Sequence, residues 1–340
     1  MEIFLYFCLF LFGTLFGSFS SVIIYRLKSG EKGIMTGRSH CGACNTTLKA
    51  LDLIPIFSWL IHKGKCAYCK KAVSAVYPFL ELSAGTLFAL IGYFLIDFSA
   101  IFAGDTGEII KLLFWCIIGI LSIIYIFYDI LFLEIHEGVM ATGVVLMFLA
   151  LTTQTLFPGF DVFPYLQSGE GISGNLLYGS IILSAGIISG LYFIMLRGLD
   201  EKIDAVILTG LILLLVGFKY LFGIELTQIP ILNGLIGVLS IFTFFFLQIF
   251  VSKGAWLGGG DLRIAIMIGI GLGATLSFPG MMLTYLSGTI ISIGYLIYSK
   301  YIHKEKSLNT QIPFGPFLAI GFFLALFYQN EILNLMKVYF

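Results

Sequence analysis

The sequence has few charged residues. Lys, Arg, Asp and Glu together make up 11% of its 340 positions, whereas 59% are hydrophobic and the mean hydropathy is +1.02. Soluble domains carry about 25% charged residues, so this composition excludes a water-soluble globular protein. It predicts a membrane protein whose surface is solvated by lipid. The chain also lacks an excess of either sign, with 19 basic and 19 acidic residues. We expect the lipid bilayer, and no nucleic acid, among its partners.

Basic residues are also missing before the first apolar run, which a secretory signal peptide would need. The chain begins Met1-Glu2, and Arg26 and Lys28 follow the run directly. We therefore expect residues 1–25 to form a retained transmembrane helix with its N-terminus outside.

Long apolar runs recur along the whole chain. Crossing a bilayer takes about 20 apolar residues, and runs near this length occur at 3–25, 78–98, 110–128, 138–158, 173–196, 204–223, 229–251, 262–278, 280–299 and 314–336. The sequence predicts an all-α integral membrane protein with about ten transmembrane helices.

The placement of basic residues orients this topology. If successive runs cross the membrane in alternate directions, the inner segments 26–77, 129–137, 197–203, 252–263 and 300–313 hold 16 of the 19 Lys and Arg residues. The outer side keeps only Lys111, Lys219 and Lys337. This asymmetry follows the positive-inside rule, although the long first loop supplies more than half of it.

The first inner loop, residues 26–77, contains two Cys-x-x-Cys motifs. Cys41 and Cys44 form the first, and Cys66 and Cys69 form the second. Two such motifs at this separation favour a zinc ion held by four thiolates, a closed shell with a structural role. Two disulfides or four idle thiols are the alternatives, and a reducing cytosolic side disfavours the disulfides.

Two aspartates lie at the predicted inner ends of membrane helices. Asp129 ends the third run, and Asp261 opens the eighth after Gly258, Gly259 and Gly260. Acids at the membrane edge are costly and mark candidate functional sites. Two carboxylates brought close share a proton, so one acts as general acid while the other activates a water.

A simpler interpretation of both aspartates stays open. An Asp at a helix start is often only an N-cap, and Asp261 is placed to be one. Asp129 lies at a helix C-terminal end, where the helix dipole disfavours a negative charge. Position alone does not decide between capping and catalysis.

Several motifs, in order along the chain, resemble the prepilin peptidase (type IV leader peptidase) family, a GxGD class of membrane aspartic peptidases. The matching segments are 17–19, 22–27, the two cysteine motifs with 51–55, 58–60 and 63–66 around them, 77–78 with Glu81, Asp129, 258–261 and 313–317.

The resemblance implies an activity and a location. Asp129 and Asp261 would be the catalytic pair, and the four cysteines would hold zinc. The substrates would be type IV prepilins or pseudopilins, whose basic leader is cleaved after a glycine at the cytoplasmic face of the bacterial inner membrane. Many members with the cysteine loop also methylate the new N-terminus with S-adenosylmethionine.

The chain departs from the family pattern in three places. His136 and Glu137 stand where the family usually has Pro followed by Asp or Asn, and Arg263 replaces a Lys. The two aspartates are also 132 positions apart, which leaves room for four crossings where the family's usual eight-helix plan has two. We infer an inserted helical hairpin in about 159–230, with a solvated charged turn near Arg197 and Asp200, within a peptidase domain at 78–340.

Two other functional classes remain to be weighed. A proton-coupled transporter fits many helices with acids and glycine breaks, but it predicts acids near the bilayer centre and internal repeats. A non-catalytic membrane scaffold is suggested by the insertion and by His136, whereas retention of both aspartates opposes it.

Overall fold

The computed structural model is built from helices. It describes residues 2–30, 39–157, 159–166, 172–198, 200–298 and 312–339, and within these ranges there is no strand, only two isolated β-bridges. Parts of three segments singled out above lie outside the described residues: 31–38 of the cysteine loop, 167–171 of the insertion, and 300–311 of the last inner segment. The chain divides into two compact units, Met1–Phe132 and Leu133–Phe340.

The predicted helical membrane fold is confirmed. Eight described helices are long and apolar enough to cross a membrane, and a bent pair near the C-terminus raises the number to nine. Ten were expected because 262–278 and 280–299 look like separate runs. The structure has two helices in this region, joined at a kink in α10 (Gly259–Tyr298), and the kink is at Gly273 rather than at Pro279. The count of eight takes α10 as one span.

Three long helices form the first unit: α1 (Glu2–Ser29), α3 (Val76–Leu95) and α5 (Thr106–Phe132). The short helices η1 (Ala50–Leu53) and α2 (Phe57–Ile61) lie in the cysteine loop, and α4 (Phe98–Phe102) precedes α5. Glycines let α1 and α3 approach closely, since a Cβ on Gly17 would lie 2.8 Å from the Glu81 backbone. Small residues at such contacts are how membrane helices pack without a hydrophobic driving force.

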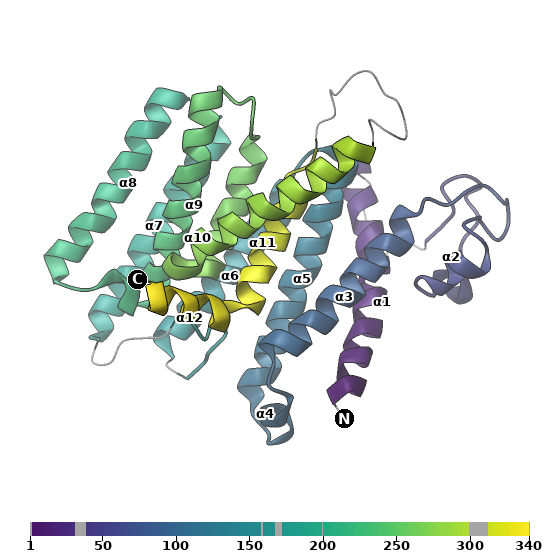
Figure 1. Ribbon diagram of the computed structural model, residues 1–340, viewed down its shortest axis with the longest axis horizontal. Helices are drawn as coiled ribbons and strands as arrows, with labels where there is room; N and C mark the ends of the chain where they lie inside the picture. The colour runs from purple at the N-terminus through teal and green to yellow at the C-terminus, as the bar shows by residue number, and fades with distance from the viewer. Residues whose placement is uncertain are drawn as a thin grey trace. The chain divides into compact units, whose positions relative to one another are not determined.

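The end of α1, the start of α3 and the end of α5 meet at one end of this unit. Tyr25 stacks on Tyr77 with ring centroids 5.6 Å apart, and Phe132 contacts both Tyr25 and Tyr128. Aromatic belts of this kind lie at membrane–water interfaces. The cysteine loop extends from the same end, near α2 in Figure 1.

The second unit is organised around α9 (Pro230–Ser252) and α10, which pack along each other. The helices α6 (Glu137–Leu156), α7 (Gly174–Arg197) and α11 (Gly315–Phe327) also contact α10. The 3-10 helix η2 (Leu226–Gln228) precedes α9, and α12 (Gln329–Tyr339) follows α11 after a bend of 72°. A cluster of buried aliphatic and aromatic residues from α9, α10 and α11 forms the core.

The break in α10 has a local cause. Gly273 has φ 61° and ψ −169°, a conformation open essentially to glycine alone, and a Cβ there would lie 2.6 Å from Leu166. The buried Asn233 side chain accepts a hydrogen bond from the Ala274 N–H at 2.8 Å, so it caps the second part of α10. Asn233 had no visible role in the sequence, because its partner is 41 positions away.

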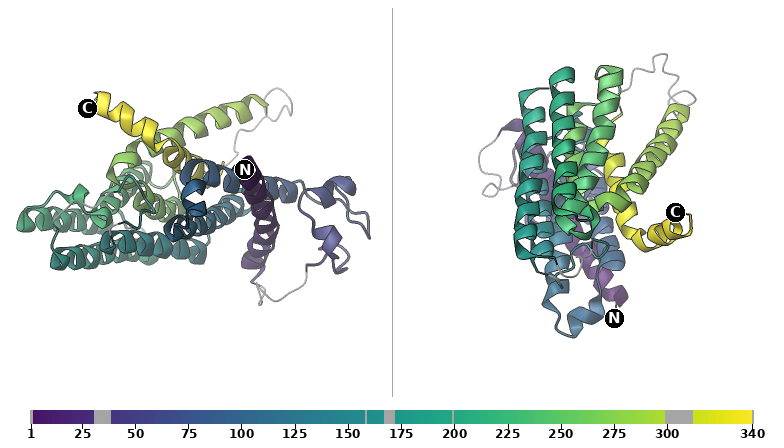
Figure 2. Two further views of the ribbon diagram at one scale, coloured as in Figure 1. Left: turned by 90° about the horizontal axis from the view of Figure 1, so that it is seen from below. Right: turned by 90° about the vertical axis from the view of Figure 1, so that its left-hand side faces the viewer.

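The hairpin of α7 and α8 (Glu201–Phe222) lies along α9, and Figure 2 shows these helices side by side. In the 18-residue apolar stretch of α8, only 11% of the residues are buried, which is the smallest share among the eight helices. Arg197 and Asp200 are exposed as expected, but Asp204 in the same turn is fully buried and paired with Arg197. The turn is therefore anchored by an internal ion pair.

Candidate functional site

The four cysteines form one cluster. Their sulfur atoms all lie within 4.8 Å of one another, and the Sγ atoms of Cys41 and Cys69 are 3.9 Å apart. None of the four is in a disulfide. A tetrahedral ion with bonds of about 2.3 Å to sulfur requires sulfurs about 3.8 Å apart. The cluster therefore fits a four-coordinate metal ion.

The two cysteine motifs adopt the same backbone design. In the first, Cys41 donates its N–H to Thr46 and accepts from the Asn45 N–H, and Asn45 has φ 53°. In the second, Cys66 donates its N–H to the Lys71 carbonyl and accepts from the Lys70 N–H, and Lys70 has φ 59°. Each tight turn presents two thiols from one side, so two turns can close a shell of four.

A small set of contacts supports the residues between the turns, and we call residues 39–75 the cysteine module. The Trp59 indole N–H donates to the Val73 carbonyl at 3.0 Å. The Asp52 carboxylate accepts from the Lys49 N–H and the Tyr68 hydroxyl, and these bonds hold the pKa of Asp52 below its usual range. The hub at Asp52 was not recognised from the sequence, where it stood only as part of a family motif.

Glu81 ties the cysteine module to the helices. Its carboxylate accepts a hydrogen bond from the Ile56 N–H at 2.7 Å and a second from Ser18 on α1. Ile56 has φ 62°, an unusual value for a β-branched residue, just before α2 begins. Glu81 thus joins α1, α3 and the module.

Asp129 lies in the last turn of α5 and is buried, with 7% of its surface exposed. The side chains of Tyr125 and Tyr128 on α5 are buried as well. Leu133, with φ 53°, ends the helix one residue after Phe132. Asp129 is therefore at the same end of the first unit as the cysteine module.

Asp261 lies in the first turn of α10 and is also 7% exposed. Its Oδ2 atom accepts from the Gly258 N–H at 3.1 Å, while its own N–H donates to the Gly258 carbonyl. This is the reach-back half of a capping box, with Gly258 rather than Asp261 in the N-cap position. A Cβ on Gly260 would lie 2.9 Å from Ile135, so this glycine permits close packing before α6.

The two substituted positions of the family pattern meet in the structure. Arg263 donates a hydrogen bond from Nε to Glu137 at 2.7 Å and pairs a second time with the same carboxylate through Nη2. Its Nη1 donates to the Gly259 carbonyl at 3.2 Å. Arg can make this two-pronged contact and Lys cannot. His136 is half-buried at the N-cap of α6. The start of α6 is therefore fastened to the start of α10.

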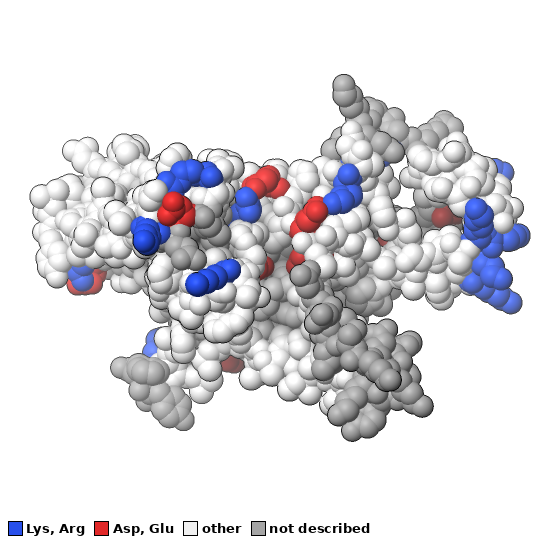
Figure 3. Space-filling view, turned by 90° about the horizontal axis from the view of Figure 1, so that it is seen from above, with Lys and Arg blue, Asp and Glu red and all other residues white. Residues whose placement is uncertain are grey.

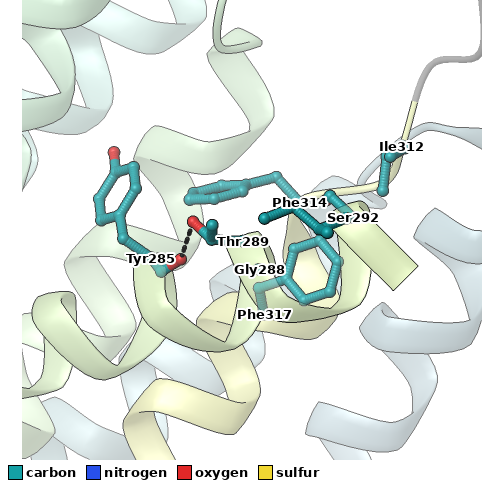
Figure 4. Close-up of a pocket in the computed structure, with 8 residues that line it drawn as sticks. Tyr285, Gly288, Thr289, Ser292, Ile312, Phe314 and Phe317 are labelled. Atoms are coloured by element: carbon teal, nitrogen blue, oxygen red, sulfur yellow. Dashed lines mark hydrogen bonds between the residues drawn. The ribbon is translucent and has the colours of Figure 1, made fainter. Parts of the chain in front are cut away.

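A cavity of about 330 Å³ lies between the second part of α10 and the start of α11. Thr289 and Ser292 line it from α10, and the rings of Phe314 and Phe317 face them (Figure 4). Tyr285, at its edge, exchanges hydrogen bonds with Gln248 and interacts electrostatically with Asp261. The cavity is a mostly apolar groove near one of the two aspartates.

The sequence-predicted residues thus fall into separate groups. The structure brings the four cysteines together, joins Glu137 to Arg263, and places Gly258 on the Asp261 carboxylate. Glu81 belongs with the cysteine module. Asp129 is in the first unit, and Asp261 is in the second.

Comparisons with known proteins agree over nearly the whole chain. Residues 11–95 match the model of the bacterial peptidase A24 N-terminal domain. The prepilin leader peptidase/N-methyltransferase of Aeromonas salmonicida (strain A449) is 25% identical over 96% of this chain and 92% of that protein. The protein of the same name from Legionella pneumophila is 24% identical over 97% and 94%.

A shorter match has a higher identity. The Bacillus subtilis (strain 168) prepilin leader peptidase/N-methyltransferase is 42% identical over 25% of this chain and 34% of that protein. No solved structure matches. The long and short matches carry the same name. The chain is a multi-pass membrane protein that is similar over nearly its whole length to prepilin leader peptidase/N-methyltransferases.

Proposed function

We propose that this protein is a membrane aspartic endopeptidase that removes the basic leader from type IV prepilins or pseudopilins, with Asp129 and Asp261 as its catalytic pair. The similar proteins named prepilin leader peptidase/N-methyltransferase support the substrate class. The observation that carries the proposal is the burial of both aspartates at helix ends.

The other buried acids have visible structural roles. The described helices bury four carboxylates: Glu81, Asp129, Asp204 and Asp261. Asp204 is neutralised by Arg197, and Glu81 accepts from the Ile56 N–H and Ser18. Asp129 and Asp261 are the two that match the family's catalytic positions, so they are the pair to which we assign the chemistry.

The proposed reaction needs only these two carboxyl groups and a water. The ionised carboxylate removes a proton from the water, whose oxygen bonds to the scissile carbonyl carbon. The protonated partner donates its proton, and the carbon–nitrogen bond breaks with the new amine leaving protonated. The Gly258 N–H bond holds Asp261 in place for this role.

We propose that the end of the first unit with Asp129 and the cysteine module faces the cytoplasm. Arg26, Lys28 and the lysines of the module lie at this end, whereas Lys111 is at the other. Prepilin leaders are basic and would reach Asp129 from this side. The scarcity of Lys and Arg in the predicted outer segments favours the same orientation.

We further propose that the metal of the cysteine module is zinc, held by Cys41, Cys44, Cys66 and Cys69. Four thiolates in a closed shell suit zinc, and the ion would fold a segment with little core of its own. The apolar groove near Phe314 does not fit the charged and nucleoside parts of S-adenosylmethionine, so we assign no residue to methyl transfer. Methylation of the new N-terminus remains a prediction from the names of the relatives.

The pair of helices α7 and α8 is our candidate for the inserted hairpin. Both lie within the range 159–230, and α8 has the most exposed surface among the membrane helices, as a peripheral addition would. Their removal would expose the surfaces of α6, α9 and α10 that they contact, but it would leave the contacts that α6, α9, α10 and α11 make among themselves in place.

The test is the cleavage of a purified prepilin by the full-length protein in proteoliposomes. Asp129→Asn and Asp261→Asn should each lower kcat by at least about 10²–10⁴-fold, because each removes a carboxyl group needed for proton transfer. Asp105→Asn, at an exposed turn before α5, is the matched control and should retain full activity. Thermal unfolding and metal content should stay unchanged in all three. Full activity in either catalytic variant would refute the assignment.

A further inference from the structure

The surface of the cysteine module is unusual for a segment outside the membrane, because it exposes large apolar side chains beside lysines. The exposed fractions are 59% for Phe57, 57% for Leu60, 72% for Ile61 and 77% for Leu51. Three of these residues belong to the single short helix α2. If the module faced water, this apolar surface would be exposed to solvent, which is unfavourable and favours aggregation.

The same module carries a strong positive charge. Its five lysines, Lys49, Lys63, Lys65, Lys70 and Lys71, are all exposed. Its single acid, Asp52, is occupied by the Lys49 N–H and the Tyr68 hydroxyl. Even with the double negative charge of a divalent ion and four thiolates, the module stays positive. Figure 3 shows the lysines gathered at this end of the first unit.

The hydrogen bond to Glu81 sets the depth of α2. Glu81 is the sixth residue of α3, so it lies about 7.5 Å along the helix axis from Val76. With only 20 residues, α3 needs nearly its full length to cross a bilayer core of about 30 Å. The hydrogen bond from the Ile56 N–H to Glu81 therefore holds the start of α2 at the level of the lipid headgroups and first acyl carbons, and not in the water outside them.

We propose that the cysteine module is a membrane-surface anchor: α2 inserts Phe57, Leu60 and Ile61 into the interface, and the surrounding lysines bind the headgroups of anionic phospholipids. Interfacial helices insert their apolar faces about 5–10 Å deep and pair them with basic residues. Lysines near an anionic leaflet are attracted to it within a Debye length. This role is independent of the proposed peptidase activity.

The positive charge selects lipid over the other candidate occupants of this surface. A basic prepilin leader would be repelled by the lysines, and a second copy of the module would present the same charge. Anionic headgroups complement both the charge and the depth of α2. Metal binding would then also support lipid binding, because a module folded around the metal keeps its lysines beside α2.

The test is photo-crosslinking of the full-length protein in nanodiscs that hold one copy each and contain phosphatidylglycerol and phosphatidylcholine in known proportion. A photoreactive amino acid replaces Ile61, or Ile290 on α10 as a control, since Ile290 is 64% exposed on a membrane helix. Mass spectrometry identifies what is attached. We expect lipid adducts at both positions, with phosphatidylglycerol enriched at least about twofold over its share at position 61 and not at 290.

A charge variant separates the two parts of the proposal. Replacing Lys63, Lys65, Lys70 and Lys71 together by Gln should remove the phosphatidylglycerol enrichment at position 61 and lower the adduct yield, with metal content unchanged. Equal enrichment at both positions, or enrichment that survives in the variant, would overturn the headgroup role. Crosslinks from position 61 to this chain's own residues 133–340, or to an added prepilin, in place of lipid would overturn the membrane anchor itself. The Asp261→Asn variant should crosslink like the parent, which keeps this test apart from that of the peptidase.

Discussion

The cysteine module and the start of α10 are ordered by different means. In the module, four thiols within 29 residues converge through two short turns, and the backbone between them forms only one turn of η1 and one of α2. At the start of α10, Arg263 reaches Glu137 across 126 positions, and Asn233 caps the second part of the helix across 41. We expect the first region to depend on a bound ion, whereas the second depends on packing between distant segments.

This difference predicts how each region fails. A metal-dependent segment with a small core loses its structure as a whole when one ligand is removed. A helix start held by several packing and polar contacts loses stability in steps, one contact at a time. Four substitutions, ordered from the largest expected effect, test the comparison.

Cys66→Ser should have the largest effect, because it removes one ligand from a closed shell. Structural zinc contributes an apparent free energy of about 10–16 kcal/mol in small zinc modules, so we expect bound metal to fall from about one ion per chain to background. Amide hydrogen exchange should quicken across 39–75 and stay slow in α3 and α5. Metal analysis and exchange mass spectrometry measure both.

Cys8→Ser provides the control for that loss. Cys8 is an exposed thiol on α1, away from the cluster, so its replacement should leave metal content at about one ion per chain. Metal retained at full stoichiometry in Cys66→Ser would reject the cluster as the metal site.

The module was also the region that the sequence predicted best. Ligand spacing is local, so the pattern from Cys41 to Cys69 was enough to predict the cluster. The number of spans was harder: the Pro279-Gly280 pair looked like the boundary between two helices, but the chain turns at Gly273. Only Asn233 and Leu166, distant in sequence, make Gly273 the preferred position.

The same limit applies to the surroundings of Asp261. The family resemblance singled out Glu137 and Arg263 as two unrelated departures, and the structure joins them. Nothing in the spacing of the two residues predicts that contact, because it depends on where α6 begins beside α10. The Glu81 contact with Ile56 was missed for the same reason.

Gly273→Ala should be the most damaging single change in the second unit. The new Cβ would require an unfavourable backbone conformation and would overlap Leu166 and the Asn233 amide. We expect a loss of about 2–4 kcal/mol in the free energy of unfolding, seen as a lower thermal midpoint in detergent. Gly294→Ala, later in α10 with no atom within 4 Å of its Cβ position, should be neutral or slightly stabilising. Equal effects would show that the break is not required.

Arg263→Gln tests the contact between α6 and α10. It removes the paired hydrogen bonds to Glu137 and the bond to Gly259, so Asp261 should be positioned less well and kcat should fall about 10-fold, with KM nearly unchanged. Arg263→Lys should recover part of this loss by keeping the charge. A double-mutant cycle with Glu137→Gln should give a coupling energy of about 0.5–1.5 kcal/mol.

Arg197→Gln is the comparison for Arg263, because it breaks a different ion pair of the second unit, one whose acid is fully buried. It leaves Asp204 buried without its cation, so thermal stability should drop while kcat and KM of the folded protein stay the same. If both variants lower kcat alike, the Glu137–Arg263 contact has no special role at the site.

The smallest effect is expected in the groove beside Asp261. The groove between α10 and α11 is an apolar space of about 330 Å³, and Tyr285 at its edge interacts electrostatically with Asp261, so we expect part of the substrate to lie in it. Ser292→Trp would fill part of it, so we expect KM to rise about 3- to 10-fold with kcat unchanged. Ile290→Trp adds the same ring on an exposed face of α10 outside the groove and should leave both constants as they are. Equal KM values for the two tryptophan variants would mean that the substrate does not occupy the groove, and Asp261 would then receive its peptide from another direction.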